Sequence, residues 1–287
     1  MRTGSSFTGE TGKIDQKQKE SRRSYDGSGP DKLYVIGIGP GDIEYLSLKA
    51  YKLLQQVEVV VGYTTYIELI DELLSPDQQI ISTGMGGEKE RAEKAIARAA
   101  GGQSVAVISS GDPGIYGMAG LILEILKRRK EKKSAADSIE VEIVPGITAS
   151  TASAAALGAP LMHDHAVISL SDLLTPWDKI KKRIKAAASS DMITALYNPR
   201  SSQRTEQIKI ARDIFLDHCS PETPAGIVRS ARRGEDEEVV ITCLKNMLDH
   251  RIDMLSTVII GNSSTYVDEG MMLAEDGAMI TPRGYEL

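Results

Sequence analysis

The chain has 287 residues, of which 41% are hydrophobic and 26% are charged, as in a globular protein of one large or two medium domains. A formal net charge of −6 disfavours nucleic-acid binding, which favours a basic surface. No apolar run approaches the ~20 residues that span a bilayer, and the two cysteines form neither a metal-type spacing nor a disulfide framework. We therefore expect a cytoplasmic protein with no membrane segment, no nucleic-acid partner and no metal site.

Residues 1–32 are polar, rich in Gly, Ser and Lys, and almost devoid of aliphatic side chains. Such a segment buries too little apolar surface to offset the entropy lost on ordering. We expect a disordered N-terminal extension over these residues.

From residue 33 the chain alternates between short apolar runs and segments with helical spacing. The alternation predicts a mostly parallel sheet with helices on both faces. The predicted strands are 33–38, 57–62, 104–110 and 141–146. The predicted helices are 47–56, 63–74, 88–100, 118–133 and 147–158.

The second half repeats this pattern with more strands, and its last two predicted strands are so close in sequence that we expect some antiparallel pairing. The predicted strands are 166–171, 192–197, 225–230, 238–243 and 256–261, and the predicted helices are 177–188 and 204–219. The fold class is thus α/β with two α/β domains. We place the first domain at 33–150 and the second at 151–287.

The first strand runs into GIGPGD at residues 37–42. A dinucleotide-binding turn would carry glycine at the sixth position of this motif and free N–H groups facing a pyrophosphate. Here Pro40 has no N–H, and Asp42 places a carboxylate where a phosphate would be repelled. The turn suits an adenosyl ligand without phosphates better than a dinucleotide.

Two further glycine-containing turns follow predicted strands: ISSGDPGIYG at 108–117 and VPGITAS at 144–150. Ligands of open α/β sheets bind at the carboxyl ends of the strands. We expect the three turns to converge on one crevice there.

These turns, in this order and spacing, resemble those of the tetrapyrrole (class III) methyltransferases, which use S-adenosylmethionine. Within that superfamily, further stretches resemble the precorrin-3B C(17)-methyltransferases and cobalt-factor III methyltransferases of cobalamin (vitamin B12) biosynthesis. The stretches are VVGYTTYIELI, LGAPLMHDHAVISLSDLLTPWDKIKKRI, LYNPRSSQR, IIGNSST and ITPRGY. The resemblance covers about residues 32–287.

The resemblance implies two α/β domains with S-adenosylmethionine in the cleft between them, a tetrapyrrole substrate and a homodimer. For Asp112, contact with the cofactor's cationic end, contact with its ribose and stabilisation of its own turn all remain open. Cofactor contacts are expected from Gly39, Pro40, Ser110, Gly111, Asp112, Ile115, Tyr116, Thr148, Ala149, Asn198 and Ala231.

The implied reaction moves a methyl group to carbon 17 of the macrocycle and contracts the ring, giving precorrin-4 or cobalt-precorrin-4. Ring contraction needs a proton acceptor, and the candidates are His163, Asp164, His165 and Asp172. The HDH run (163–165) starts a predicted strand, and capping of the turn there is the favoured alternative for its side chains. The substrate's carboxylates call for arginines. Expected substrate contacts are Ser169, Ser171, Tyr197, Arg200 and Arg204.

Other activities are compatible with parts of the pattern. The nearest is another enzyme of the same fold, acting at a different corrin position, on uroporphyrinogen, on diphthine or on RNA. A nicotinamide-dependent oxidoreductase and a non-catalytic sensor are the alternatives from other classes. The sequence leaves open whether the substrate already contains cobalt, which residue is the base, any accessory redox partner and what the N-terminal extension does.

Overall fold

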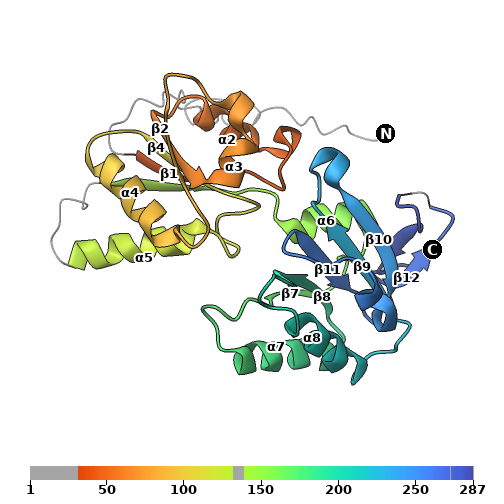
Figure 1. Cartoon of the computed structure of the whole chain (residues 1–287). Coiled ribbons are helices and arrows are strands. Elements are labelled where there is room, and N and C mark those ends of the chain that lie inside the picture. Colours follow the sequence, from red (N-terminus) through yellow and green to blue (C-terminus); the bar gives the residue numbers. More distant parts are fainter. Residues whose placement is uncertain (1–31, 132–138, 272, 287) are drawn as a thin grey trace, which may run out of the picture.

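The computed structural model describes residues 32–131, 139–271 and 273–286. These residues form two α/β domains, the first at the upper left and the second at the lower right of Figure 1. The predicted extension at 1–32 lies outside the described residues except for Lys32, which is already part of the first strand. None of the described helices is long and apolar enough to cross a membrane.

The first domain is built on a five-stranded sheet in the order β3-β2-β4-β1-β5, and every pairing in it is parallel. Its strands are β1 (Lys32–Gly37), β2 (Val59–Tyr63), β3 (Gln79–Thr83), β4 (Val105–Ser109) and β5 (Glu140–Val144). Its helices are α2 (Leu48–Leu54), α3 (Thr64–Glu68), α4 (Glu88–Ala100) and α5 (Met118–Glu131).

Both faces of this sheet are buried, which is why its strands read as continuous apolar runs. Leu33 and Val35 of β1 pack in one core with α4 and α5, whereas Tyr34 and Ile36 pack in the other with α2 and α3. The three glycine-containing turns follow β1, β4 and β5 and so lie at the carboxyl edge of this sheet.

The second domain has a mixed five-stranded sheet in the order β10-β9-β11-β8-β7 and a small three-stranded sheet, β12-β13-β6. The large sheet comprises β7 (His165–Ser169), β8 (Ile193–Tyr197), β9 (Pro224–Arg229), β10 (Glu238–Cys243) and β11 (Ser256–Ile260). The small sheet comprises β6 (Gly158–Ala159), β12 (Tyr266–Asp268) and β13 (Ala278–Ile280). The helices are α6 (Ala149–Leu157), α7 (Trp177–Ser189) and α8 (Gln207–Leu216).

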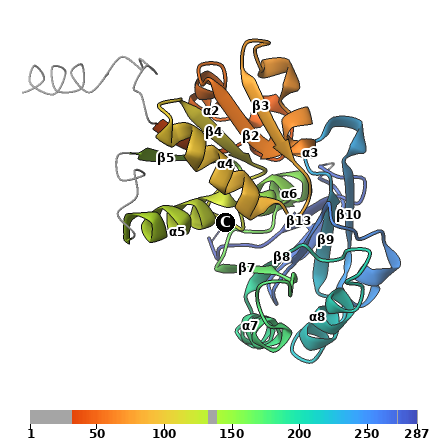
Figure 2. The ribbon, with the colours of Figure 1, turned by 60° about the vertical axis from the view of Figure 1, so that its left-hand side comes forward.

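Helices α7 and α8 cover one face of the large sheet and α6 covers the other, where the chain enters the second domain (Figures 1 and 2). Gly226 of β9 makes room for α6, because a Cβ at this position would lie 2.6 Å from Leu157 Cδ2. Since α6 packs on the second sheet and β5 belongs to the first, we keep a domain boundary near residue 150 as a proposal.

The structure agrees with most of the predicted elements and differs in three places. The predicted helix at 63–74 is only α3 followed by a 3₁₀ turn at Asp71–Leu73. β3 and the small sheet were not predicted, because their strands are short or mostly exposed and lack the apolar signal of a buried strand. Antiparallel pairing does occur in the second half, but β9 lies between β10 and β11.

Candidate functional site

Three turns meet at the carboxyl edge of the first sheet: the first turn (37–42) after β1, the second turn (110–117) after β4 and the third turn (144–150) after β5. The Gly39 and Gly111 backbones exchange two hydrogen bonds, with N–O distances of 3.2 and 2.7 Å. A Cβ on Gly37 would lie 2.6 Å from Gly111 O and 2.7 Å from Gly146 N. The turns therefore pack backbone against backbone, which only glycine permits.

Asp112 connects the second turn to the third. Its Oδ1 accepts the Gly114 N–H at 2.8 Å, and its Oδ2 accepts the Gly146 N–H at 3.1 Å. Of the three roles left open by the sequence, these contacts demonstrate stabilisation of the turns. Contact between Asp112 and the cofactor remains a proposal.

Tyr116 of the second turn reaches across to the second domain. Its hydroxyl accepts the Ser169 N–H at 3.1 Å and donates to the Val167 carbonyl at 3.2 Å. Ser169 Oγ in turn accepts hydrogen bonds from Asn198 Nδ2 at 3.0 Å and from the Ser171 N–H at 3.2 Å. Four residues that the sequence assigned to cofactor or substrate are thus brought together at the carboxyl ends of β7 and β8.

Tyr197 is 9% exposed, and its hydroxyl is already engaged. It lies 2.6 Å from Thr148 Oγ1 and accepts the Ser150 N–H at 2.6 Å, so it caps the first turn of α6. Its ring lies 5.8 Å from that of Tyr116, centroid to centroid. Through these contacts Tyr197 holds the third turn in place. They do not support the predicted contact between Tyr197 and substrate.

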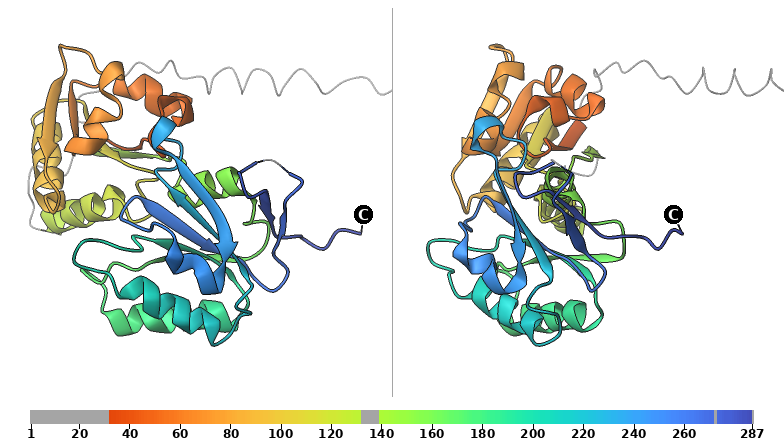
Figure 3. Two further views of the ribbon diagram at one scale, coloured as in Figure 1. Left: turned by 45° about the vertical axis from the view of Figure 1, so that its right-hand side comes forward. Right: turned by 90° about the vertical axis from the view of Figure 1, so that its right-hand side faces the viewer.

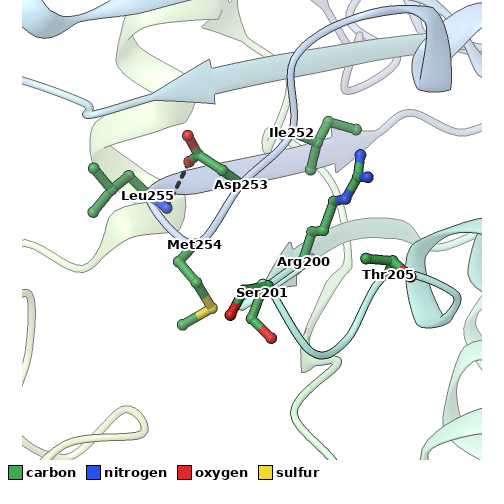
Figure 4. A pocket seen from close by; sticks show the side chains of 8 residues that line it. Arg200, Ser201, Thr205, Ile252, Asp253, Met254 and Leu255 are labelled. Carbon is green, nitrogen blue, oxygen red and sulfur yellow. Dashed lines mark hydrogen bonds between the residues drawn. The ribbon is translucent and has the colours of Figure 1, made fainter. Parts of the chain in front are cut away.

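The two arginines predicted to hold substrate differ in environment. Arg200 is exposed and lines an open hollow of about 510 Å³ together with Ser201 and Met254 (Figure 4). Arg204 is half-buried: its Nη2 donates to the Asn198 carbonyl at 2.8 Å, and its buried Nε has no partner among the described residues. Arg200 is therefore available to an anionic ligand, whereas Arg204 supports the turn that carries Asn198.

The predicted proton acceptors are not gathered at the turns. His163, Asp164 and His165 are exposed and line a separate hollow of about 720 Å³ at the amino end of β7. β7 is five residues long, which separates His165 from Ser169 by roughly 13 Å at the usual rise. Asp172 alone follows the carboxyl end of β7, and its Oδ2 accepts a hydrogen bond from Gln207 Nε2 at 2.9 Å.

The other predicted cofactor residues lie on the three turns or on the loop after β9. Ser110 and Ala231 are half-buried, Ile115 is exposed and Ala149 begins α6. Sequence reasoning missed Arg233, whose Nε donates to the Pro40 carbonyl at 2.8 Å. Burial lowers the pKa of the Arg233 guanidinium. Burial also raises the pKa of the nearby Tyr66 phenol, and the positive charge of Arg233 offsets only part of that rise. The only feature of the sequence that could have pointed to Arg233 is the pair of adjacent arginines in ARRGED (231–236).

Comparison with known proteins places this geometry in context. A model of the tetrapyrrole (corrin/porphyrin) methylases matches residues 32–248. A cobalt-factor III methyltransferase of Priestia megaterium is 52% identical over 255 residues, which are 89% of this chain and 45% of that protein, so the chain spans less than half of this relative. A probable cobalt-factor III C(17)-methyltransferase of Salmonella typhimurium is 49% identical over 255 residues, 89% of this chain and 100% of that protein. The crystal structure of the methyltransferase CobJ superposes with a TM-score of 0.77 at 33% identity, covering 87% of this chain and 99% of the other.

Proposed function

Because the chain belongs to the tetrapyrrole methylases, and within them to the cobalt-factor III and precorrin-3B C17-methyltransferases, we propose that it methylates carbon 17 of cobalt-factor III in cobalamin biosynthesis. The observation that carries the proposal is 49% identity over the whole of the Salmonella typhimurium relative. We choose cobalt-factor III over precorrin-3B because the Priestia and Salmonella relatives carry that name. Ring contraction to cobalt-precorrin-4 is part of the same proposal.

The three turns fit S-adenosylmethionine, which supplies an electrophilic methyl group when bound. None of residues 37–42, 110–117 and 144–150 is Lys or Arg, so these turns are not built to hold phosphate. Ile115 and Ile147 are 39% and 36% exposed and give the turns an apolar surface, as an adenosyl group requires. Gly39 and Gly111, at φ values of 68° and 67°, give the adjoining backbone its shape.

The chain's own contribution to methyl transfer is positioning and exclusion of water, because the displacement needs no protein nucleophile. The Tyr116–Ser169–Asn198 contacts hold the cofactor turns beside the ends of β7 and β8. Arg200, exposed at the end of β8, is the proposed contact for a carboxylate of the macrocycle.

For the proton removed during ring contraction we propose Asp172, because it alone of the four predicted acceptors follows the carboxyl end of β7. The histidines line the other hollow and receive no role in this reaction. We further propose, on the family resemblance, a homodimer that works in the cytoplasm.

The experiment is anaerobic incubation with methyl-labelled S-adenosylmethionine and, in parallel, cobalt-factor III or metal-free precorrin-3B. Label in a ring-contracted product from cobalt-factor III is the expected result. Label from precorrin-3B alone would reverse the choice of substrate. If neither is methylated while the protein binds S-adenosylhomocysteine in calorimetry, the substrate assignment is wrong and only the broader methyltransferase function stands.

A matched pair of variants tests the base. Asp172→Asn should lose the ring-contracted product yet bind S-adenosylhomocysteine normally, whereas Asp178→Asn, an exposed aspartate at the start of α7, should behave as wild type. Normal ring contraction by Asp172→Asn would exclude Asp172 as the proton acceptor.

A further inference from the structure

The loop between β9 and β10 (residues 230–237) leaves the second domain and lies against the first turn (Figure 3). The Asp42 N–H donates to the Arg232 carbonyl at 3.2 Å, and the Arg232 guanidinium lies 5.7 Å from the centre of the Tyr45 ring. Ser230 and Arg232 have φ values of 50° and 56°, in the left-handed region that such residues rarely adopt. Strain of this kind persists where surrounding contacts impose it, and it clusters at functional sites.

Arg233 of this loop makes a side-chain hydrogen bond to the first turn. Its Nε donates to the Pro40 carbonyl at 2.8 Å, from the second domain into the centre of the first turn. Its aliphatic stem crosses Gly41, where a Cβ would lie 2.7 Å from Arg233 Cγ. Gly41 therefore has to be glycine so that the arginine can reach the carbonyl.

No carboxylate forms an ion pair with Arg233 within the part of the chain that the structure describes. By contrast, Arg229 of the same domain pairs with Glu238 at 3.0 Å and with Asp253 at 2.8 Å. Asp236 acts on the Arg233 guanidinium electrostatically but lies beyond ion-pair distance, so this partly buried group carries a desolvation cost that an apolar side chain would avoid. Stability alone therefore does not account for an arginine here, whereas a need for a donor aimed at Pro40 does.

We propose that Arg233 is a positioning residue whose Nε–H holds the Pro40 carbonyl, so that the first turn takes its cofactor-binding shape only when the two domains are docked. The inference rests on the proposed function. Pro40 is an expected cofactor contact on one wall of the cleft, and Ala231, two residues before Arg233, is an expected contact on the other. Arg233 thus joins the two walls directly.

Three substitutions separate the donor from the charge. Arg233→Gln retains an N–H donor at the position of Nε, because both nitrogens follow Cβ, Cγ and Cδ, but it has no charge. Arg233→Lys retains the charge without a donor at that position, and Arg233→Ala removes both. We expect the KM for S-adenosylmethionine and the Kd for S-adenosylhomocysteine to rise about tenfold for Ala and Lys, and less than about threefold for Gln. The KM for the macrocycle should not change.

The control is Arg212→Ala on α8, a partly buried arginine that pairs with Asp213 at 2.7 Å. It should leave both KM values unchanged. If Arg233→Lys bound S-adenosylhomocysteine as tightly as wild type and Arg233→Gln bound it weakly, the proposal would be overturned, because the positive charge and not the donor would then be required. A rise only in the KM for the macrocycle would also overturn it and make Arg233 a substrate residue. If Arg233→Ala fails to fold, the comparison of Arg233→Gln with Arg233→Lys still tests the proposal. The calorimetry uses S-adenosylhomocysteine alone, so its result holds even if the proposed macrocycle is wrong.

Discussion

The hydroxyl of Tyr116, in the turn after β4, bonds to the backbone of Ser169 at the end of β7, so one side chain joins the two domains. Tyr116 is 60% exposed, so burial does not hold it in place. Its φ of 54° is left-handed, a conformation that costs a non-glycine residue of order 1–3 kcal/mol. The bonds to Ser169 and Val167, together with the contact between its ring and that of Tyr197, help to offset this strain.

Tyr116→Phe should therefore lower kcat/KM for methyl transfer about tenfold while changing the free energy of unfolding by no more than about 1 kcal/mol. The ring stays, but the second turn loses its attachment to β7. Steady-state kinetics and thermal unfolding measure the two quantities. Tyr51→Phe, on the exposed side of α2, serves as the control and should change neither. Wild-type kinetics in Tyr116→Phe would show that the cross-domain bonds are dispensable.

Asp112→Asn should destabilise the protein by about 1–3 kcal/mol. Both carboxylate oxygens accept backbone N–H groups, and an amide can offer only one acceptor to the two donors. Denaturant unfolding measures the loss, and calorimetry should show weaker S-adenosylhomocysteine binding as the second and third turns separate.

The matched control for this prediction is Asp268→Asn, because Asp268 accepts the Gly270 N–H through Oδ1 and an amide oxygen can do the same. We expect a loss below about 0.5 kcal/mol there. Equal losses at the two positions would mean that the link between the turns contributes nothing.

Two glycine-to-alanine substitutions should change the free energy of unfolding in opposite directions. Gly37→Ala should cost about 3 kcal/mol or more, because the new methyl group would overlap Gly111 O and Gly146 N, which are backbone atoms that cannot move aside. Gly120→Ala, on the exposed face of α5 with nothing within 4 Å of its Cβ, should stabilise by up to about 1 kcal/mol. Denaturant titrations give both values. A tolerated Gly37→Ala would show that the turns are not packed as described.

Asp253 should make stability depend on pH in the acid range. Burial opposes its ionisation, but hydrogen bonds from Arg229 and the Leu255 N–H outweigh burial and hold the pKa of this carboxyl below its ordinary value. A depressed pKa contributes stability above the unfolded value of about 3.9, and this contribution is lost as the pH falls through the folded value.

Asp253→Asn should accordingly have a lower Tm than wild type at pH 7, and the gap should narrow below about pH 4. Differential scanning calorimetry from pH 7 to pH 3 measures this difference in Tm between the variant and wild type. Asp217→Asn, exposed at the end of α8, gives the reference for an unpaired surface position. A gap that stays constant down to pH 3 would contradict the assignment of the ion pair with Arg229.

Periodicity and composition were enough to predict four of the five strands of the parallel first sheet and the place of the three glycine-containing turns. The segments 88–100 and 238–243 were predicted with the bounds of α4 and β10, because an amphipathic helix and a half-buried strand leave strong local patterns. The meeting of the three turns followed from the rule that parallel strands present their carboxyl ends on one edge. These features depend on local sequence and on general topology.

Residues whose role depends on a partner from another element could not be assigned. Tyr197 was predicted to contact substrate, but its hydroxyl caps α6, and no local pattern announces a partner 49 residues away. His163 and His165 were predicted as proton acceptors because of their chemistry, and strand direction puts them at the amino end of β7, away from the three turns. Arg233 was overlooked because its partner, Pro40, lies 193 positions earlier.

The contact between Gly226 and Leu157 bears on how a mutational scan of this protein should be interpreted. Any side chain at position 226 pushes against α6, and the other end of α6 carries the third turn. A scan that scores methyltransferase activity should therefore group position 226 with the expected cofactor residues, although it lies inside a strand of the second domain. Its phenotype would report a displaced helix, and only a direct measurement of cofactor affinity beside protein abundance would distinguish such positions from true contacts.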